Sequence, residues 1–201
     1  MIKQLLIVSL IFSFLSTQAQ KIYVWCPENF EVKPRTGLIM TDTINIVFFD
    51  GRSFPKKNKI ECSPDELFQT LFSQLKITYP KIIFNMLPEA DYYKKTVKGD
   101  GVTLKIGLAA YHSGFGTDIS GGIGIVGGQL STMIIPKGQW NAVTAYYVQL
   151  FRDEISKLKE ISNLASRPNM WGYKSARTAL IETYNKSNQE LLFFLDQEFT
   201  K

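Results

Sequence analysis

The stretch VTLKIGLAAY, residues 102–111, decides the fold class, because apolar side chains recur at every second position along it. A period of two predicts a strand with one buried face. The turn sequence KGDG at residues 98–101 marks where this strand begins. The side chains of its predicted buried face are Val102, Leu104, Ile106, Leu108 and Ala110.

Strands are predicted on both sides of this stretch as well. Residues 43–49 (TINIVFF) are rich in the β-branched and aromatic side chains that strands favour. Residues 155–164 have two interpretations, because their apolar spacing fits a helix and also fits the return strand of a hairpin, which we favour. A loop is expected at residues 167–169. The remaining predicted strands are residues 22–25, 81–87, 129–135 and 140–151.

Two helices are predicted. The first begins at Ser63, which can cap it, with Pro64 in the first helical position and Glu66 completing a capping box. Pro80 ends this helix. The second covers residues 173–199, whose apolar residues fall near one face. This order of elements predicts an α+β fold, with a mostly antiparallel sheet and two helices packed on one face.

The first 19 residues have the pattern of an export signal. Lys3 precedes an apolar run at residues 5–16, and Ala19 ends a plausible cleavage site. The run of about 12 residues is shorter than the roughly 20 that a membrane-spanning helix needs, which favours a signal peptide. A retained membrane anchor is the alternative. We expect residues 1–19 to be a signal peptide and residues 20–201 to form one exported domain, in the periplasm or at the outer membrane.

Export would place the two cysteines in an oxidising compartment. Cys26 and Cys62 allow a single intramolecular pairing, and an oxidising compartment favours a disulfide between them. The alternative is a pair of reduced, buried thiols, since free cysteine packs as a small hydrophobe. A metal site is not expected, because only His112 could add another soft ligand.

A glycine-rich segment at residues 114–128 contains GIGIVG at residues 122–127, which spells a dinucleotide-binding motif. That motif needs a helix directly after its glycines, and here a strand-like stretch follows, so no cofactor is expected. We expect this segment to be a hairpin loop that can contact a partner or a membrane. The candidate contact residues, with two neighbouring aromatics, are Ile119, Ile123, Ile125, Val126, Tyr111 and Trp140.

Catalytic residues are not expected. His112 is the one histidine, and a hydrolase would need it to work with Asp50 or Asp118. No motif supports that arrangement, so we interpret His112 as a structural residue. Asp50 and Arg52 flank a glycine after a predicted strand, and we expect them to form a structural ion pair.

The net charge is weak for a chain of 201 residues. Lys and Arg total 23 against 18 Asp and Glu, a formal charge of +5. The short lysine clusters near residues 56–59 and 94–98 lack interleaved aromatics, so they indicate solvated loops. Together with export, this charge argues against a nucleic-acid partner.

Five stretches together carry a family resemblance: the strand ending in FDGR at residues 49–52, the capped helix at residues 64–76, the strands at residues 102–111 and 143–151, and the helix opening SARTAL at residues 175–180. They resemble small bacterial envelope lipoproteins of the YajG type, and the α+β architecture at the amino terminus of TolB is similar. The resemblance implies an α+β fold and a non-catalytic place in the envelope. This sequence departs from the family in having no lipobox cysteine.

The functional hypothesis is therefore a non-enzymatic, exported envelope protein that binds another protein or a surface component. The alternative is a small periplasmic module that binds a glycan or a lipid. The oligomeric state and the identity of the partner do not follow from these residues.

Overall fold

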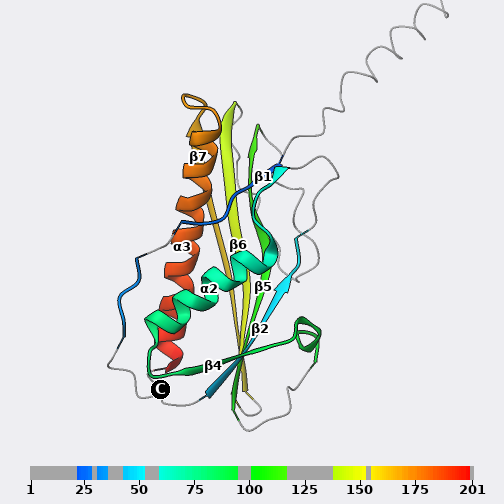
Figure 1. Cartoon of the computed structure of the whole chain (residues 1–201), viewed down its shortest axis with the longest axis vertical. Coiled ribbons are helices and arrows are strands. Elements are labelled where there is room, and N and C mark those ends of the chain that lie inside the picture. The colour runs from blue at the N-terminus through cyan, green and yellow to red at the C-terminus, as the bar shows by residue number, and fades with distance from the viewer. Residues whose placement is uncertain are drawn as a thin grey trace, which may run out of the picture.

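The computed structural model has an α+β fold, with a seven-stranded mixed sheet and two helices on one of its faces (Figure 1). The α+β class and the two helices agree with the prediction. The residues that the structure describes are 22–28, 31–35, 43–52, 59–94, 101–116, 138–152 and 155–199.

Two helices, one short 3-10 helix and seven strands make up the described part of the chain. The helices are α2 (Pro64–Thr78) and α3 (Tyr173–Phe199), and the 3-10 helix is η1 (Glu89–Asp91). The strands are β1 (Ile22–Val24), β2 (Thr43–Asp50), β3 (Lys59–Ile60), β4 (Ile83–Leu87), β5 (Val102–Phe115), β6 (Gln139–Arg152) and β7 (Ile155–Pro168).

The sheet is built on three long antiparallel strands, β5, β6 and β7. The other edge of β5 is shared, because β2 pairs in parallel with its first half and β1 pairs antiparallel near its end. β4 extends the sheet in parallel with β2, and β3 in parallel with β1. The sheet is thus more mixed than predicted, since α2 lies between β2 and β4 in the chain and lets them run in the same direction.

Residues 155–164 form a strand, as favoured, and β7 continues through Pro168, so the loop predicted at residues 167–169 begins later than expected. The capping box at Ser63 is present, with the Glu66 amide donating to Ser63 Oγ and the Ser63 amide donating to Glu66 Oε2 at 2.8 Å. The strand predicted at residues 129–135 lies outside the described residues.

The core lies between the sheet and the two helices. A helix of 27 residues is about 40 Å long and a strand of 14 residues about 46 Å, so α3 can cover almost the whole length of β6 and β7. Leu180, Leu191 and Leu195 of α3 are fully buried there, and Leu71 and Leu75 of α2 join the same cluster. Within the described ranges, no helix has the length and apolar character needed to cross a membrane.

A layer of polar contacts runs through this core. Asn188 of α3 accepts a hydrogen bond from the Tyr146 hydroxyl at 3.0 Å and donates one to Gln74 of α2 at 2.9 Å. Thr183 pairs with Thr144 of β6 at 2.8 Å. These contacts explain why α3 tolerates polar residues in its middle, because buried polar groups must find partners and these fix the helix against the sheet.

A register shift in β5 changes which residues face the helices. Alternation from Val102 predicts that Ala110 faces the core and Tyr111 faces away. The pairing with β6 shifts between Leu108 and Ala110, so the two positions exchange faces. Tyr111 packs edge-on against Tyr184 of α3, while Ala110 belongs to a separate apolar cluster.

The opposite face of the sheet holds a buried lysine. Lys105 donates from its Nζ to the carbonyl oxygens of Tyr92, at 2.8 Å, and of Lys94, and its Nζ lies 4.9 Å from the centre of the Phe151 ring. Burial lowers the pKa of the Lys105 ammonium. The segment after η1 is therefore fastened to the sheet by this side chain.

Replacing Gly107 by alanine should loosen that segment. An added Cβ would collide with the Tyr92 hydroxyl and lie 3.1 Å from Tyr92 Cζ, so the tyrosine ring would have to move. We expect Gly107→Ala to lower the free energy of unfolding by about 1–3 kcal/mol in urea denaturation, as for other overpacked sites. Combining it with Tyr92→Phe removes the hydroxyl oxygen and should recover part of the loss; equal losses in the single and double variants would contradict the collision.

Candidate functional site

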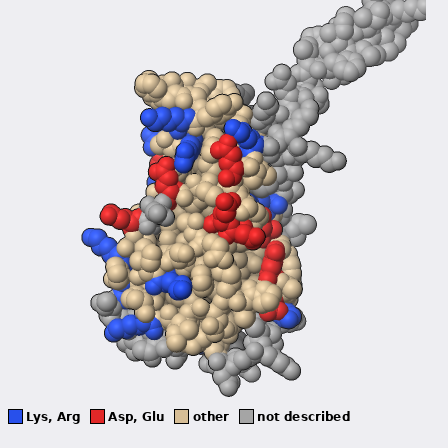
Figure 2. All heavy atoms as spheres, in the orientation of Figure 1, with Lys and Arg blue, Asp and Glu red and all other residues tan. Residues whose placement is uncertain are grey.

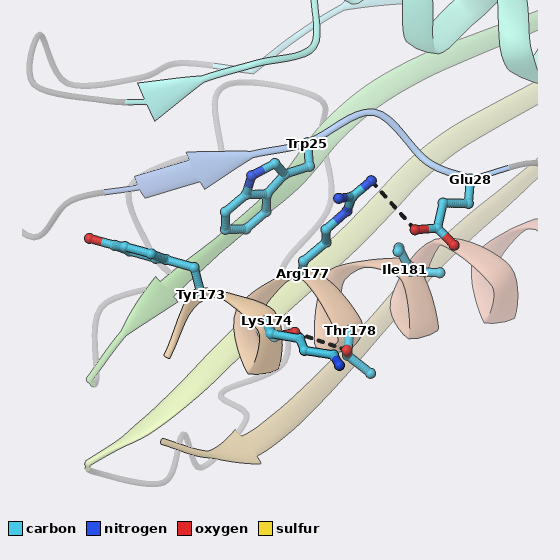
Figure 3. A pocket seen from close by; sticks show the side chains of 7 residues that line it. All are labelled: Trp25, Glu28, Tyr173, Lys174, Arg177, Thr178 and Ile181. Carbon is cyan, nitrogen blue, oxygen red and sulfur yellow. Dashed lines mark hydrogen bonds and ion pairs between the residues drawn. The ribbon is translucent and has the colours of Figure 1, made fainter. Parts of the chain in front are cut away.

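A pocket of about 580 Å³ opens between the chain that follows β1 and the first three turns of α3 (Figure 3). We call it the Trp25–Arg177 pocket. It is lined by Trp25, Glu28, Tyr173, Lys174, Arg177, Thr178 and Ile181.

The helical wall of the pocket follows from the period of α3. Lys174, Arg177, Thr178 and Ile181 are spaced three and four residues apart, which places them on one face of the helix. Thr178 donates its hydroxyl hydrogen to the Lys174 carbonyl oxygen at 2.9 Å, so its side chain is held against the helix backbone. This wall presents two cationic side chains and one apolar side chain to the cavity.

The opposite wall is held in place by a disulfide. Cys26, next to Trp25, is joined to Cys62, which directly precedes the Ser63 cap of α2. The Glu61 amide also donates to the Val24 carbonyl oxygen at 2.9 Å. Glu66 lies near the two sulfur atoms, but sulfurs joined in a disulfide cannot act as thiolate metal ligands. The predicted disulfide is present, and it ties the wall to α2.

Aromatic rings form one end of the pocket. The Tyr23 and Trp25 rings stack with centroids 5.6 Å apart, and the Tyr23 and Tyr173 rings lie 5.0 Å apart. The Tyr23 hydroxyl donates to the Tyr173 hydroxyl at 3.2 Å. That hydrogen bond, together with burial, raises the pKa of Tyr23 to about 12. Tyr23 therefore stays neutral at physiological pH, and its hydrogen bond joins strand β1 to the start of α3.

Charges line the other end. Arg177 Nη2 lies 3.4 Å from Glu28 Oε1, and both side chains are largely exposed. Hydrogen bonds from Lys59 and, to a smaller extent, from the Trp25 side chain lower the pKa of Glu61, with a further contribution from the positive charge of Arg177. Exposed ion pairs of this kind contribute little energy, so they can be exchanged for contacts with a ligand.

Tyr111 and Trp140, expected as contact residues, are both buried, which corrects that expectation. The Tyr111 hydroxyl donates to the Trp25 carbonyl oxygen at 2.8 Å. Trp140 donates from Nε1 to Asn169 Oδ1 at 2.8 Å, and its ring lies 5.7 Å from that of Tyr173. The two residues support the pocket from behind and present no surface to a partner.

The remaining candidates fall into two groups. Asp50 and Arg52 form a two-pronged ion pair at the end of β2, with Arg52 Nε 2.7 Å from Asp50 Oδ1 and Nη2 3.1 Å from Oδ2. His112 is fully buried in β5. Five candidates lie outside the described residues: Asp118, Ile119, Ile123, Ile125 and Val126.

The sequence reasoning missed the pocket residues Trp25, Tyr173 and Arg177. One signal was present, because the spacing of residues 174, 177, 178 and 181 marks a face of the helix separate from its apolar face. The other wall gave no such signal, since Trp25 is about 150 positions away in the chain. The pairing of β1 with the end of β5 brings it beside α3.

Comparisons with known proteins return structural neighbours of low similarity. One is an uncharacterized protein with 12% identity and a TM-score of 0.40, covering 82% of this chain and 99% of its own. Another is the hypothetical protein CT253 from Chlamydia trachomatis, with 8% identity and a TM-score of 0.45, covering 79% of this chain and 96% of its own. No protein-family model and no curated protein sequence matches this chain.

Proposed function

We propose that this chain is a non-enzymatic, exported protein of the cell envelope, and that it binds a surface component in the Trp25–Arg177 pocket. The observation that carries the proposal is the pocket itself, which combines aromatic walls with cationic side chains. Its volume of about 580 Å³ lies in the usual range of ligand sites. The Cys26–Cys62 disulfide supports an oxidising compartment.

The chemistry of the lining favours an acidic glycan over the other surface components. The apolar face of a sugar ring can pack on an exposed tyrosine or tryptophan ring, and Tyr173 and Trp25 stand at one end of the pocket. A carboxylate on that sugar would lie toward Arg177 and Lys174, where a guanidinium can bind it through two parallel hydrogen bonds. A protein partner is the alternative hypothesis for the same pocket.

Binding of defined oligosaccharides tests this proposal. Tri-galacturonic acid is the acidic probe and maltotriose its neutral counterpart, with binding followed by tryptophan fluorescence and by calorimetry. We expect the acidic probe to bind more tightly, and Tyr173→Ala or Arg177→Ala to weaken it about tenfold or more, as for residues that carry much of a contact.

Lys186→Ala is the matched control, since Lys186 is an exposed cation of the same helix that does not line the pocket. Its affinity should equal that of the unmodified protein. Unchanged affinity in Tyr173→Ala and Arg177→Ala would rule the pocket out as the glycan site. Absence of binding to either oligosaccharide would leave the protein-partner alternative as the better hypothesis.

A further inference from the structure

The turn between β7 and α3 carries two large apolar side chains that no other described residue covers. Met170 is 74% exposed and Trp171 is 73% exposed, among the highest values for apolar residues in the described part of the chain. They belong to the turn in which the long strand β7 leads into α3, and this turn lies at one end of the described part of the chain (Figure 1). We call residues 168–172 the Met170–Trp171 tip.

The tip is held by specific hydrogen bonds. The Met170 amide donates to the Pro168 carbonyl oxygen at 2.8 Å, and the Trp171 amide donates to Ser175 Oγ at 3.3 Å. Gly172 adopts a positive φ of 55°, which lets the chain turn directly into the helix. These contacts hold the backbone of the tip in place, and with it the backbone of Trp171.

Basic side chains surround the base of the tip. Figure 2 shows a cap of uncharged side chains at this end of the molecule, with Lys and Arg gathered immediately below it. Arg167 is the last residue but one of β7, while Lys174 and Arg177 lie in the first two turns of α3, within about 6 Å of its first residue along the helix axis. Arg167 and Arg177 form exposed ion pairs with Glu182 and Glu28, which anionic headgroups could replace.

An apolar cap above a basic ring matches the two layers of an anionic membrane surface. Tryptophan is enriched at the headgroup level of membranes, and interfacial side chains enter roughly 5–10 Å deep. A protein partner fits less well, because two side chains cover far less than the roughly 800 Å² that each partner buries in a stable interface. We propose that the Met170–Trp171 tip docks this protein on a lipid bilayer that contains anionic headgroups.

Vesicle binding tests the proposal with the chain from Gln20 to Lys201. That chain contains every contact described above and omits the apolar run at residues 5–16, which would bind vesicles by itself. The probes are vesicles of equal parts phosphatidylglycerol and phosphatidylcholine, and vesicles of phosphatidylcholine alone. We expect binding to the first kind, a blue shift of tryptophan fluorescence, and weaker binding at high salt.

Two variants distinguish docking through the tip from nonspecific adsorption to vesicles. Met170→Ala combined with Trp171→Ala should reduce binding to anionic vesicles about tenfold or more, because the inserted apolar area is lost. Phe193→Ala, a change at a residue of α3 that is 64% exposed and lies away from the tip, should leave binding unchanged. Neither variant touches the lining of the Trp25–Arg177 pocket, so binding of oligosaccharides should persist in both.

Three results would overturn the proposal. They are absence of binding to anionic vesicles, equal binding by the double variant, and equal binding to the two kinds of vesicle. A drop in melting temperature of the double variant would be detected by circular dichroism, and Arg167→Gln, a change at an exposed residue that does not line the Trp25–Arg177 pocket, then provides the second variant. It should reduce binding to anionic vesicles several-fold, since each basic residue near such a surface adds attraction.

Discussion

Raising the pH from 9 to 11 should unfold this protein in one cooperative step, because its core contains tyrosines that cannot ionise without leaving it. Four of them lie between the sheet and the helices, almost wholly inaccessible to solvent: Tyr79, Tyr111, Tyr146 and Tyr184. Burial is the main reason that the pKa of each phenol lies well above its ordinary value near 10. In the unfolded chain the same four groups regain ordinary pKa values.

The sign of the effect follows from which state holds the protons. A group whose folded pKa is raised contributes stability that is complete below its unfolded pKa and is lost as the pH rises toward its folded pKa. At pH 11 each unfolded tyrosine gains about 1.4 kcal/mol by ionising, so that the four together remove about 6 kcal/mol. A typical domain has a stability of about 5–15 kcal/mol, so this loss matches the whole stability of a domain near the lower end of that range.

Lys105 acts in the opposite direction but cannot prevent the transition. Because burial lowers its pKa, the unfolded state holds its proton more tightly, and stability rises with pH between the folded pKa of Lys105 and about 10.5. One lysine opposes four tyrosines, and its contribution is complete by about pH 10.5. The net slope above that pH is therefore set by the tyrosines.

The measurement is an alkaline titration followed at 295 nm, which reports ionised tyrosine, and by near-ultraviolet circular dichroism, which reports packing. The buried tyrosines should ionise together with the loss of packing. Tyr93→Phe is the control, since Tyr93 is exposed and its removal should leave the transition unchanged. Smooth ionisation of all nine tyrosines near pH 10, with packing retained, would contradict the argument.

Local patterns were enough to predict most of the elements. The capping box at Ser63 depends on residues three apart, and the alternation over residues 102–108 depends on the pleat of one strand. Both could be predicted because the controlling interactions lie within a few positions. The β6–β7 hairpin was predictable for the same reason, since its two strands are joined directly.

Interactions between distant segments limited the prediction of the site. Tyr111 was expected to be exposed because alternation carries no information about the register shift at Leu108, which comes from the pairing of β5 with β6. The Trp25–Arg177 pocket needs β1 beside α3, and no local pattern indicates that neighbour. Ser187 and Asn188 lower the helix propensity of α3, and their role appears only once Thr144 and Gln74 lie opposite them.

Replacing both cysteines, Cys26→Ser with Cys62→Ser, should have the second large effect. The disulfide closes a loop with a sequence separation of 36, and removing such a cross-link enlarges the unfolded ensemble. In the chain-entropy model this costs about 3–4 kcal/mol of unfolding free energy. Urea denaturation of the double variant and of the unmodified protein measures the difference.

The same change should lower the ligand affinity of the pocket even where the packing of α3 on the sheet is retained. Trp25 precedes Cys26 directly, and β1 has only three residues, so we expect the disulfide to add substantially to the restraint that strand pairing places on that wall. In buffer at pH 7 without urea, the double variant should still be folded. It should nevertheless bind tri-galacturonic acid less tightly than the unmodified protein. Docking of the Met170–Trp171 tip on anionic vesicles should persist, because its hydrogen bonds lie within residues 168–176.

A reductant separates the cross-link from the side chains that form it. Dithiothreitol should lower the stability of the unmodified protein to that of the double variant and leave the double variant unchanged. A loss below about 1 kcal/mol would mean that the unfolded chain is already compact around residues 26–62, against the chain-entropy model. Undiminished oligosaccharide binding in the folded double variant would instead show that the remaining contacts, such as strand pairing and the Tyr111–Trp25 hydrogen bond, are enough to keep Trp25 in place.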